Sequence, residues 1–159
     1  MSSTLASPPP SWGDPNLSDA EKRALAAMCA RMIPASDEYK VPGADDPLIQ
    51  ADIAKSLGRD AKAVHDALAH LETIAAGSLA DLPPEKQDEA CATMREHGGM
   101  NFTLLTRIVL QCYYRDDRVM ISLGMEPRPP FPKGHDLPQG DWSLLDPVRA
   151  RGKIWRDAP

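Results

Sequence analysis

The chain has 159 residues, a formal net charge of −5, 26% charged residues and only 5% aromatic residues. This length is sufficient for one domain with a hydrophobic core, and the negative net charge gives no electrostatic basis for binding nucleic acid. No stretch approaches the roughly 18 consecutive apolar residues of a membrane-spanning helix. The three cysteines, Cys29, Cys91 and Cys112, each lie in an apolar helical pattern, which favours buried free thiols over disulfides or ligands.

Residues 1–16 are rich in serine and proline and are expected to form a flexible N-terminal segment. Its Trp12 can dock on a protein surface. This segment has no basic start, no apolar run and no twin arginine, so it does not have the pattern of a secretory or Tat signal. The prediction from this pattern is a cytoplasmic protein.

The first helix is predicted from a capping box. Ser18 and Glu21 have the required spacing, and apolar residues then recur at helical spacing up to Ile33. Pro34 should end this helix. A loop with two turn signals is expected to follow over residues 34–46.

Two further helices are predicted after this loop. Asp46 followed by Pro47 resembles an N-cap with proline at the first helical position, and Gly58 should end that helix. Asp60 can cap the next helix, which Gly77 should end. The predicted inner faces are Leu48, Ile49, Ile53 and Leu57 in the first helix and Val64, Leu68, Leu71 and Ile74 in the second.

The fourth and fifth predicted helices meet at a pair of glycines. The fourth opens at Leu82-Pro-Pro-Glu85 and runs to about His97, and Gly98-Gly99 should end it. Asn101 is expected to cap the fifth and most apolar helix. The expected inner residues are Ala90, Cys91 and Met94 in the fourth helix and Leu104 or Leu105, Ile108, Val109 and Cys112 in the fifth.

A short sixth helix should start at Asp116 or Asp117 and close at Gly124. No stretch alternates apolar and polar residues between hairpin turns, so no strand is predicted. The predicted fold is therefore all-α: a bundle of five or six short helices over residues 17–124, followed by a long, Pro-rich extended C-terminal arm over residues 125–159.

The C-terminal arm combines prolines with large apolar side chains. It holds seven of the sixteen prolines, which excludes a long helix or a central strand, although Asp146 and Pro147 can start one last turn. It also holds Phe131, Trp142 and Trp155, whereas disordered linkers are poor in aromatic residues. Such an arm should lie against a protein surface. It either straps its own helices or docks on another protein.

Motifs for catalysis and cofactors are not found in the sequence. There is no G-x-G-x-x-G, no P-loop, no C-x-x-C, no H-E-x-x-H and no G-x-S-x-G. The prediction is a chain with no catalytic residue, no metal site and no cofactor of its own.

The densest polar cluster is the stretch from Tyr113 to Arg118. Tyrosine and arginine are enriched at interaction hot spots, so one interpretation is an interface or a ligand site. The other is a junction between helices, with Asp116 and Asp117 capping and pairing locally, and this is favoured for the two aspartates. Adjacent helical residues point about 100° apart, so one tyrosine can face the core and the other the arm. The residues predicted to bind a partner are Tyr113, Tyr114, Arg115, Arg128, Phe131, Trp142, Arg149, Arg151 and Trp155.

Three segments together resemble a known family. They are Met32-Ile-Pro-Ala-Ser-Asp37 with Pro42-Gly-Ala-Asp45, the helix end Tyr113-Tyr-Arg-Asp116, and the short helix to Gly124 before a Pro-rich end. In their order and spacing they resemble the gluconate 2-dehydrogenase subunit 3 family, over roughly residues 18–135. The resemblance implies a small subunit that stabilises a flavoprotein and assists its maturation. FAD and the catalytic residues would belong to a large subunit of the glucose-methanol-choline (GMC) oxidoreductase type, which acts on alcohols or sugars. Because no Tat signal is recognised, a cytoplasmic hetero-oligomer is expected.

Two other functions are compatible with the sequence. One is a stand-alone helical enzyme that uses Tyr113, Arg115, Asp116 or His135. The other is a helical ligand-binding or regulatory module, which would contain an apolar pocket. The sequence favours the accessory subunit over both.

Overall fold

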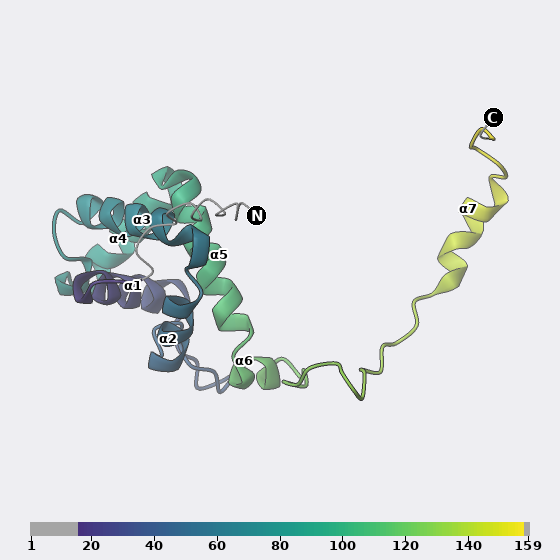
Figure 1. Ribbon diagram of the computed structural model, residues 1–159, viewed down its shortest axis with the longest axis horizontal. Coiled ribbons are helices and arrows are strands. Elements are labelled where there is room, and N and C mark those ends of the chain that lie inside the picture. The colour runs from purple at the N-terminus through teal and green to yellow at the C-terminus, as the bar shows by residue number, and fades with distance from the viewer. Residues whose placement is uncertain (1–15, 158–159) are drawn as a thin grey trace, which may run out of the picture. The chain divides into compact units, whose positions relative to one another are not determined.

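The computed structural model describes residues 16–157, and the chain is all-α, as predicted (Figure 1). Within this range no strand forms, and only Ser36 and Val41 pair in an isolated bridge. Residues 16–127 form one compact unit, called here the helical unit, and residues 128–157 form a second, called the C-terminal unit. The predicted flexible segment, apart from Asn16, lies outside the described residues. The elements are α1 (Asp19–Met32), α2 (Pro47–Lys55), η1 (Gly58–Asp60), α3 (Ala61–Ile74), η2 (Leu79–Asp81), α4 (Pro84–His97), α5 (Gly99–Tyr114), α6 (Asp117–Ser122), η3 (Trp142–Leu145) and α7 (Asp146–Ala150).

The predicted caps of α1 and α2 are confirmed. The Ser18 hydroxyl accepts from the Glu21 backbone N–H at 3.3 Å, and the Glu21 carboxylate accepts from the Ser18 N–H at 2.8 Å. In α2, the Asp46 carboxylate accepts from the Leu48 N–H at 2.9 Å, with Pro47 at the first helical position. These local bonds fix where both helices begin.

Three local predictions in this region are wrong. Leu48 is 69% exposed, because only Ile49 and Ile53 on α2 turn toward the core. The helix ends at Lys55, and Gly58 begins η1 instead of closing α2. The side chain of Asp60 does not cap α3, because its carboxylate accepts from Arg107 of α5 at 2.7 Å.

The junction between α4 and α5 is tighter than the sequence suggested, so Asn101 is not a cap. It lies in the first turn of α5, whose N-cap is Gly98. A Cβ at Gly98 would lie 2.5 Å from the Met94 carbonyl oxygen and 2.6 Å from the Cβ of Phe102. Gly99 has a φ of +61°, in the region that favours glycine. Two glycines thus allow one helix to follow the other with almost no loop.

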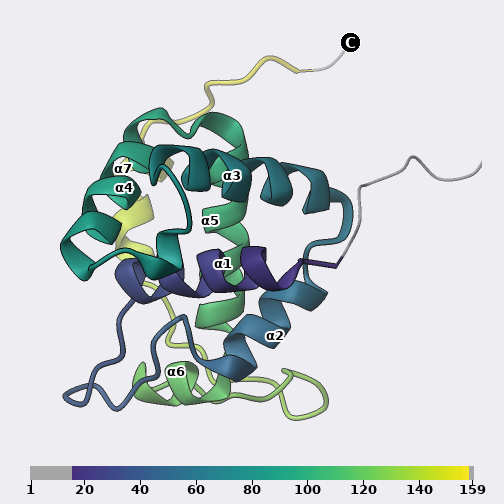
Figure 2. The ribbon, with the colours of Figure 1, turned by 90° about the vertical axis from the view of Figure 1, so that its left-hand side faces the viewer.

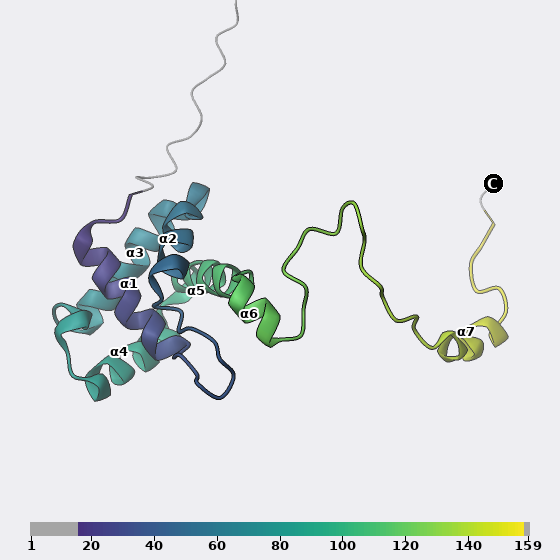
Figure 3. The ribbon, with the colours of Figure 1, turned by 90° about the horizontal axis from the view of Figure 1, so that it is seen from below.

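Helix α5 lies at the centre of the helical unit. It contacts α2, α3, α4 and α6, and it runs across α1 and α3 when the unit is viewed as in Figure 2. Helix α4 packs beside α1, and α6 continues directly from the end of α5 (Figure 3). The predicted inner face is confirmed, with Leu105 rather than Leu104 buried. Its buried members are Leu105, Ile108, Val109 and Cys112.

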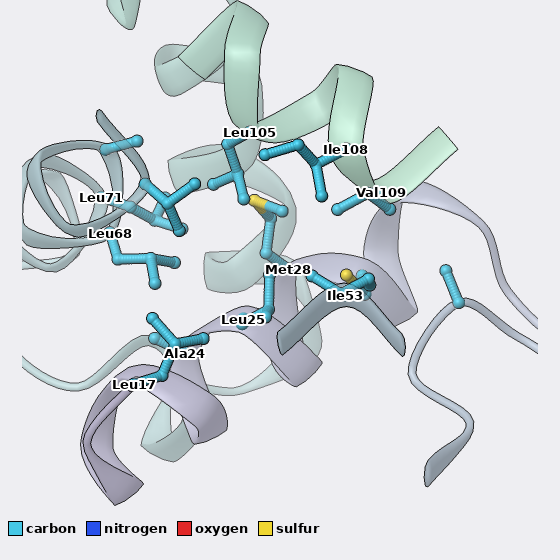
Figure 4. Close-up of a cluster of buried hydrophobic side chains, with 14 of the residues drawn as sticks. Leu17, Ala24, Leu25, Met28, Ile53, Leu68, Leu71, Leu105, Ile108 and Val109 are labelled. Carbon is cyan, nitrogen blue, oxygen red and sulfur yellow. The ribbon is translucent and has the colours of Figure 1, made fainter. Parts of the chain in front are cut away.

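The core is mainly aliphatic, as the shortage of aromatic residues requires. Side chains from α1, α2, α3 and α5 meet in one cluster (Figure 4). Every buried hydrophobic residue of the described chain lies between Leu17 and Val119. The helical unit therefore completes its core without any residue of the C-terminal unit.

The C-terminal unit has no core of its own. Its Arg128 is half-buried, and residues 129–157 are all exposed. The predicted last turn is confirmed as α7, and η3 precedes it without having been predicted. Among residues 16–157, no helix is both long and apolar enough to cross a membrane.

Replacing Ile108 by alanine should lower the free energy of unfolding by about 2–5 kcal/mol, because the side chain is 3% exposed and its loss leaves a cavity. The matched control is Leu110→Ala on the same helix, where the side chain is 39% exposed and the expected change is within about 0.5 kcal/mol. Urea unfolding followed by circular dichroism measures both. Equal effects at the two positions would contradict the assigned inner face of α5.

Candidate interaction site

Two arginines join the end of α5 to α2. The Arg115 guanidinium donates to both carboxylate oxygens of Asp52, at 2.6 and 2.7 Å, and to the Ser56 hydroxyl at 2.5 Å. This bidentate arrangement is the strong geometry for an arginine–carboxylate pair. It fixes the C-terminal end of α5 against α2.

Arg118 connects two helix caps. Its guanidinium donates to Asp46 at 2.9 and 3.0 Å and to Asp116 at 2.9 Å from each of two nitrogens. Asp46 is the N-cap of α2, and Asp116 is the N-cap of α6, where it accepts from the Arg118 N–H at 2.9 Å. One side chain therefore orients the starts of both helices.

In this network two arginines pair with three carboxylates. Hydrogen bonds from Arg118 hold the pKa of Asp46 and of Asp116 below the ordinary 3.8, and hydrogen bonds from Arg115 do the same for the pKa of Asp52. Each arginine thus has a carboxylate partner. The interpretation of Asp116 as a local cap and ion-pair partner is confirmed, and the cluster acts as a helix junction.

The two tyrosines of this cluster lie on different faces of α5, as expected for adjacent helical residues. Tyr113 is 5% exposed and belongs to the core, where burial raises the pKa of its hydroxyl, whereas Tyr114 is 52% exposed. Their rings meet edge to face, with centroids 5.2 Å apart. Of the predicted contact residues in α5, Tyr114 is therefore the one that offers an apolar surface.

Exposed apolar residues surround the junction. Leu48 lines a shallow pocket of about 380 Å³ together with Asp52, Arg115 and Arg118. Of the exposed members, Tyr114 was predicted to bind a partner, whereas Leu48 was wrongly assigned to the core because it continues a helical apolar pattern. The exposed apolar residues at this end are Leu48, Tyr114, Ile121, Leu123 and Met125.

The three segments that carry the family resemblance meet at this junction. The Ala44 N–H donates to the Ile33 carbonyl at 2.9 Å, which joins the two parts of the first segment. A Cβ at Gly43 would come within 3.0 Å of the backbone nitrogen of Ala35, so this contact depends on glycine. Asp46 follows directly, and Arg118 ties it to Asp116 of the second segment. Segments distant in sequence thus form one structural site.

The predicted aromatic residues of the C-terminal unit are exposed. Phe131 is 85% exposed, Trp142 61% and Trp155 67%. Around Trp142 and Trp155, further apolar side chains are exposed on η3, on α7 and after them. These are Leu144, Leu145, Val148 and Ile154.

The predicted arginines of this unit differ in their partners. Arg128 donates to the Gly134 carbonyl at 2.7 Å, and Arg149 pairs with Asp146 at 3.1 Å. The Arg151 side chain has no partner within residues 16–157 and is exposed. The C-terminal unit carries six Lys and Arg against four Asp and Glu, whereas residues 16–127 carry twelve against eighteen. The two units therefore have opposite net charges.

Comparisons of the chain with protein-family models, with curated proteins and with solved structures find no match. The resemblance to the gluconate 2-dehydrogenase subunit 3 family thus rests on the sequence segments and stays a prediction. In the part of the chain that the structure describes, no three His, Cys, Asp or Glu side chains lie close enough to hold a metal ion.

The Arg118 network should make stability depend on acid pH. Because the folded pKa of Asp46 and of Asp116 is depressed, their stabilisation is fully present above about pH 4, the pKa of an unfolded aspartate. It is lost as the pH falls through the lower folded values. In Arg118→Gln, the free energy of unfolding should therefore fall less between about pH 4 and pH 2 than in the unmodified chain.

The matched control is Arg59→Gln, whose guanidinium is 78% exposed and lies 4.0 Å from Asp60. It should retain the acid dependence of the unmodified chain. Urea unfolding at a series of pH values measures all three proteins, and an unchanged slope in Arg118→Gln would contradict the assigned network.

Proposed function

We propose that this chain is a non-catalytic small subunit that binds an FAD-dependent large subunit of the GMC type, stabilises it and assists its maturation. The observation that carries the proposal is the convergence of the three resembling segments on the α5–α6 junction. If these three segments build one structural site, that site is a reason for the family pattern to include all three. The complex would oxidise an alcohol or a sugar, and the site of chemistry would lie in the large subunit.

The surface chemistry of the chain supports a role in binding a protein. Single exposed apolar residues are common, but large aromatic residues clustered along one short stretch mark interaction sites. Trp142, Leu145 and Val148 recur every three residues along η3 and α7, so one side of these turns is apolar. A short helical element with such a side can lie in a groove of another protein.

The charge of the C-terminal unit indicates what the partner surface should offer. Among residues 16–157 the Arg151 side chain is unpaired, and Arg149 has a carboxylate only from its own helix. Carboxylates beside an apolar groove would complement these arginines, and bidentate pairing would add geometric specificity. We therefore expect an apolar groove with an acidic rim on the large subunit.

The isolated chain should be colourless, and the complex should be yellow. FAD is assigned to the large subunit, so flavin absorbance should follow the partner and not this chain. Affinity purification of the tagged chain from its native source, followed by an absorbance scan and mass spectrometry, measures this. The expected partner is a flavoprotein with a dinucleotide-binding glycine motif near its start. A chromophore retained in stoichiometric amount by the chain purified alone would contradict the proposal.

Replacing both Trp142 and Trp155 by alanine in the full chain should weaken binding to the large subunit by about 100-fold or more, since each buried anchor contributes about 1.5–3 kcal/mol. The control is Met100→Ala, an exposed apolar residue at the far end of α5. Titration calorimetry measures the affinities. Truncation after Pro127 should likewise abolish binding and leave the helical content of the helical unit intact, because the core ends at Val119.

Two results would count against this assignment. Full affinity in the double variant would place the docking surface on the helices. Unfolding of the truncated chain, judged by circular dichroism, would indicate that the C-terminal arm straps its own helices.

A further inference from the structure

A groove lies between α1, α4 and α5 of the helical unit. Its volume is about 680 Å³, within the range of roughly 300–1,000 Å³ typical of small-molecule sites. Of the segments that carry the proposed function, only the first residue, Met32, lies in it. Its lining residues are Met28, Arg31, Met32, Asp88, Cys91, Ala92, Arg95, Phe102, Thr103 and Thr106.

The apolar part of the groove comes from all three helices. Met28 is 2% exposed, and Met32 and Phe102 are half-buried and pack against the core. Thioether side chains are flexible and polarizable, so they adapt to ligands of different shape. This part of the groove suits an aliphatic or other apolar body.

The polar part of the groove has an unbalanced positive charge. Arg31 donates to both carboxylate oxygens of Asp88, at 2.7 and 3.1 Å, so these two charges offset each other. The Arg95 side chain forms no ion pair or hydrogen bond within residues 16–157. The lining therefore has a net charge of +1, carried by a guanidinium with all its donors available.

The hydroxyl groups of the groove do not compete as donors. Thr103 donates to the Gly99 carbonyl and Thr106 to the Thr103 carbonyl, both at 3.0 Å. Arg31 binds Asp88 through Nε and one Nη, which leaves its other Nη available. The free donors of the groove thus belong to two arginines, the arrangement that recognises a carboxylate.

We propose that this groove binds an amphipathic monoanion, a carboxylate with an apolar chain. Arg95, with the free Nη of Arg31, holds the carboxylate, and the chain lies along Met28, Met32 and Phe102. The inference does not depend on the proposed function, because a ligand in this groove leaves the C-terminal unit and the α5–α6 junction untouched.

Titration calorimetry of the full chain with octanoate tests the charge and the apolar body separately. Octanoate should bind saturably with one site per chain, and 1-octanol and acetate should each bind at least about tenfold more weakly. Arg95→Gln should weaken octanoate binding about tenfold, equivalent to about 1.4 kcal/mol. The matched control, Arg59→Gln, should bind as the unmodified chain does. Equal binding of octanoate and 1-octanol, or an unchanged affinity in Arg95→Gln, would overturn the proposal.

Alkylation of Cys91 tests the location of the ligand. Cys91 is half-buried and lines the groove, whereas Cys29 and Cys112 are buried, and burial raises the pKa of the Cys29 thiol to about 12. Cys91 should therefore react first with iodoacetamide at alkaline pH, and octanoate should slow this reaction severalfold in the unmodified chain. Ala92→Trp, which fills the groove, should abolish octanoate binding while circular dichroism shows the native helical content. An unprotected Cys91 at saturating octanoate would place the binding elsewhere and overturn the proposal; this measurement stands even if Ala92→Trp fails to fold.

Discussion

The burial of one face of α5 is the constraint on which the rest of the helical unit depends. The chain has few aromatic residues, so its core must come from aliphatic side chains that meet at a common centre. Five buried residues of α5 provide that centre, and α2, α3, α4 and α6 all contact this helix. The tight α4–α5 junction at Gly98 follows from this arrangement, because a longer loop or a side chain there would separate two helices that pack on the same core. Burial of apolar area supplies the stabilisation, and the Arg115 and Arg118 network lies at the C-terminal end of α5.

At the C-terminal end of α5, the ion pairs act mainly by fixing the positions of neighbouring helices. Exposed ion pairs contribute little to stability, typically below about 1 kcal/mol, yet Arg115 and Arg118 hold three carboxylates in defined geometry. Because Asp46 and Asp116 are also helix caps, the same bonds orient α2 and α6 with respect to α5. A site built on helices held in this way is more rigid than one built on loops. In the proposed complex, this rigid junction and the exposed apolar residues around it would offer a second contact surface.

Much of the fold could be predicted from the sequence, because the signals for it are local. Helical spacing identified the inner face of α5, and the Ser18 and Asp46 caps were predicted from residues within three positions of each other. The errors occur where residues distant in the sequence determine the contacts or the burial of a side chain. Asp60 resembles a cap by its place in the sequence, but Arg107, on another helix, takes its carboxylate. Leu48 fits a helical apolar pattern, but the core lies on the other side of α2. The bonds from Arg115 and Arg118 to α2 and its cap join residues more than 60 positions apart, so no local pattern could indicate them.

The C-terminal unit has a short helix and large exposed apolar side chains but no core of its own. Its five-residue helix is far shorter than the roughly 12 residues that an isolated helix needs for marginal stability in water. No buried residue supports it, and the helical unit has a complete core that ends at Val119. Trp142 and Trp155 are nevertheless placed around this short helix, and an apolar surface of that size is costly to leave in water. The contacts that stabilise these turns must therefore come from a surface outside residues 128–157. Because the unit is also positively charged, an apolar surface with carboxylates around it would satisfy both requirements, and in the proposed complex the large subunit would supply such a surface.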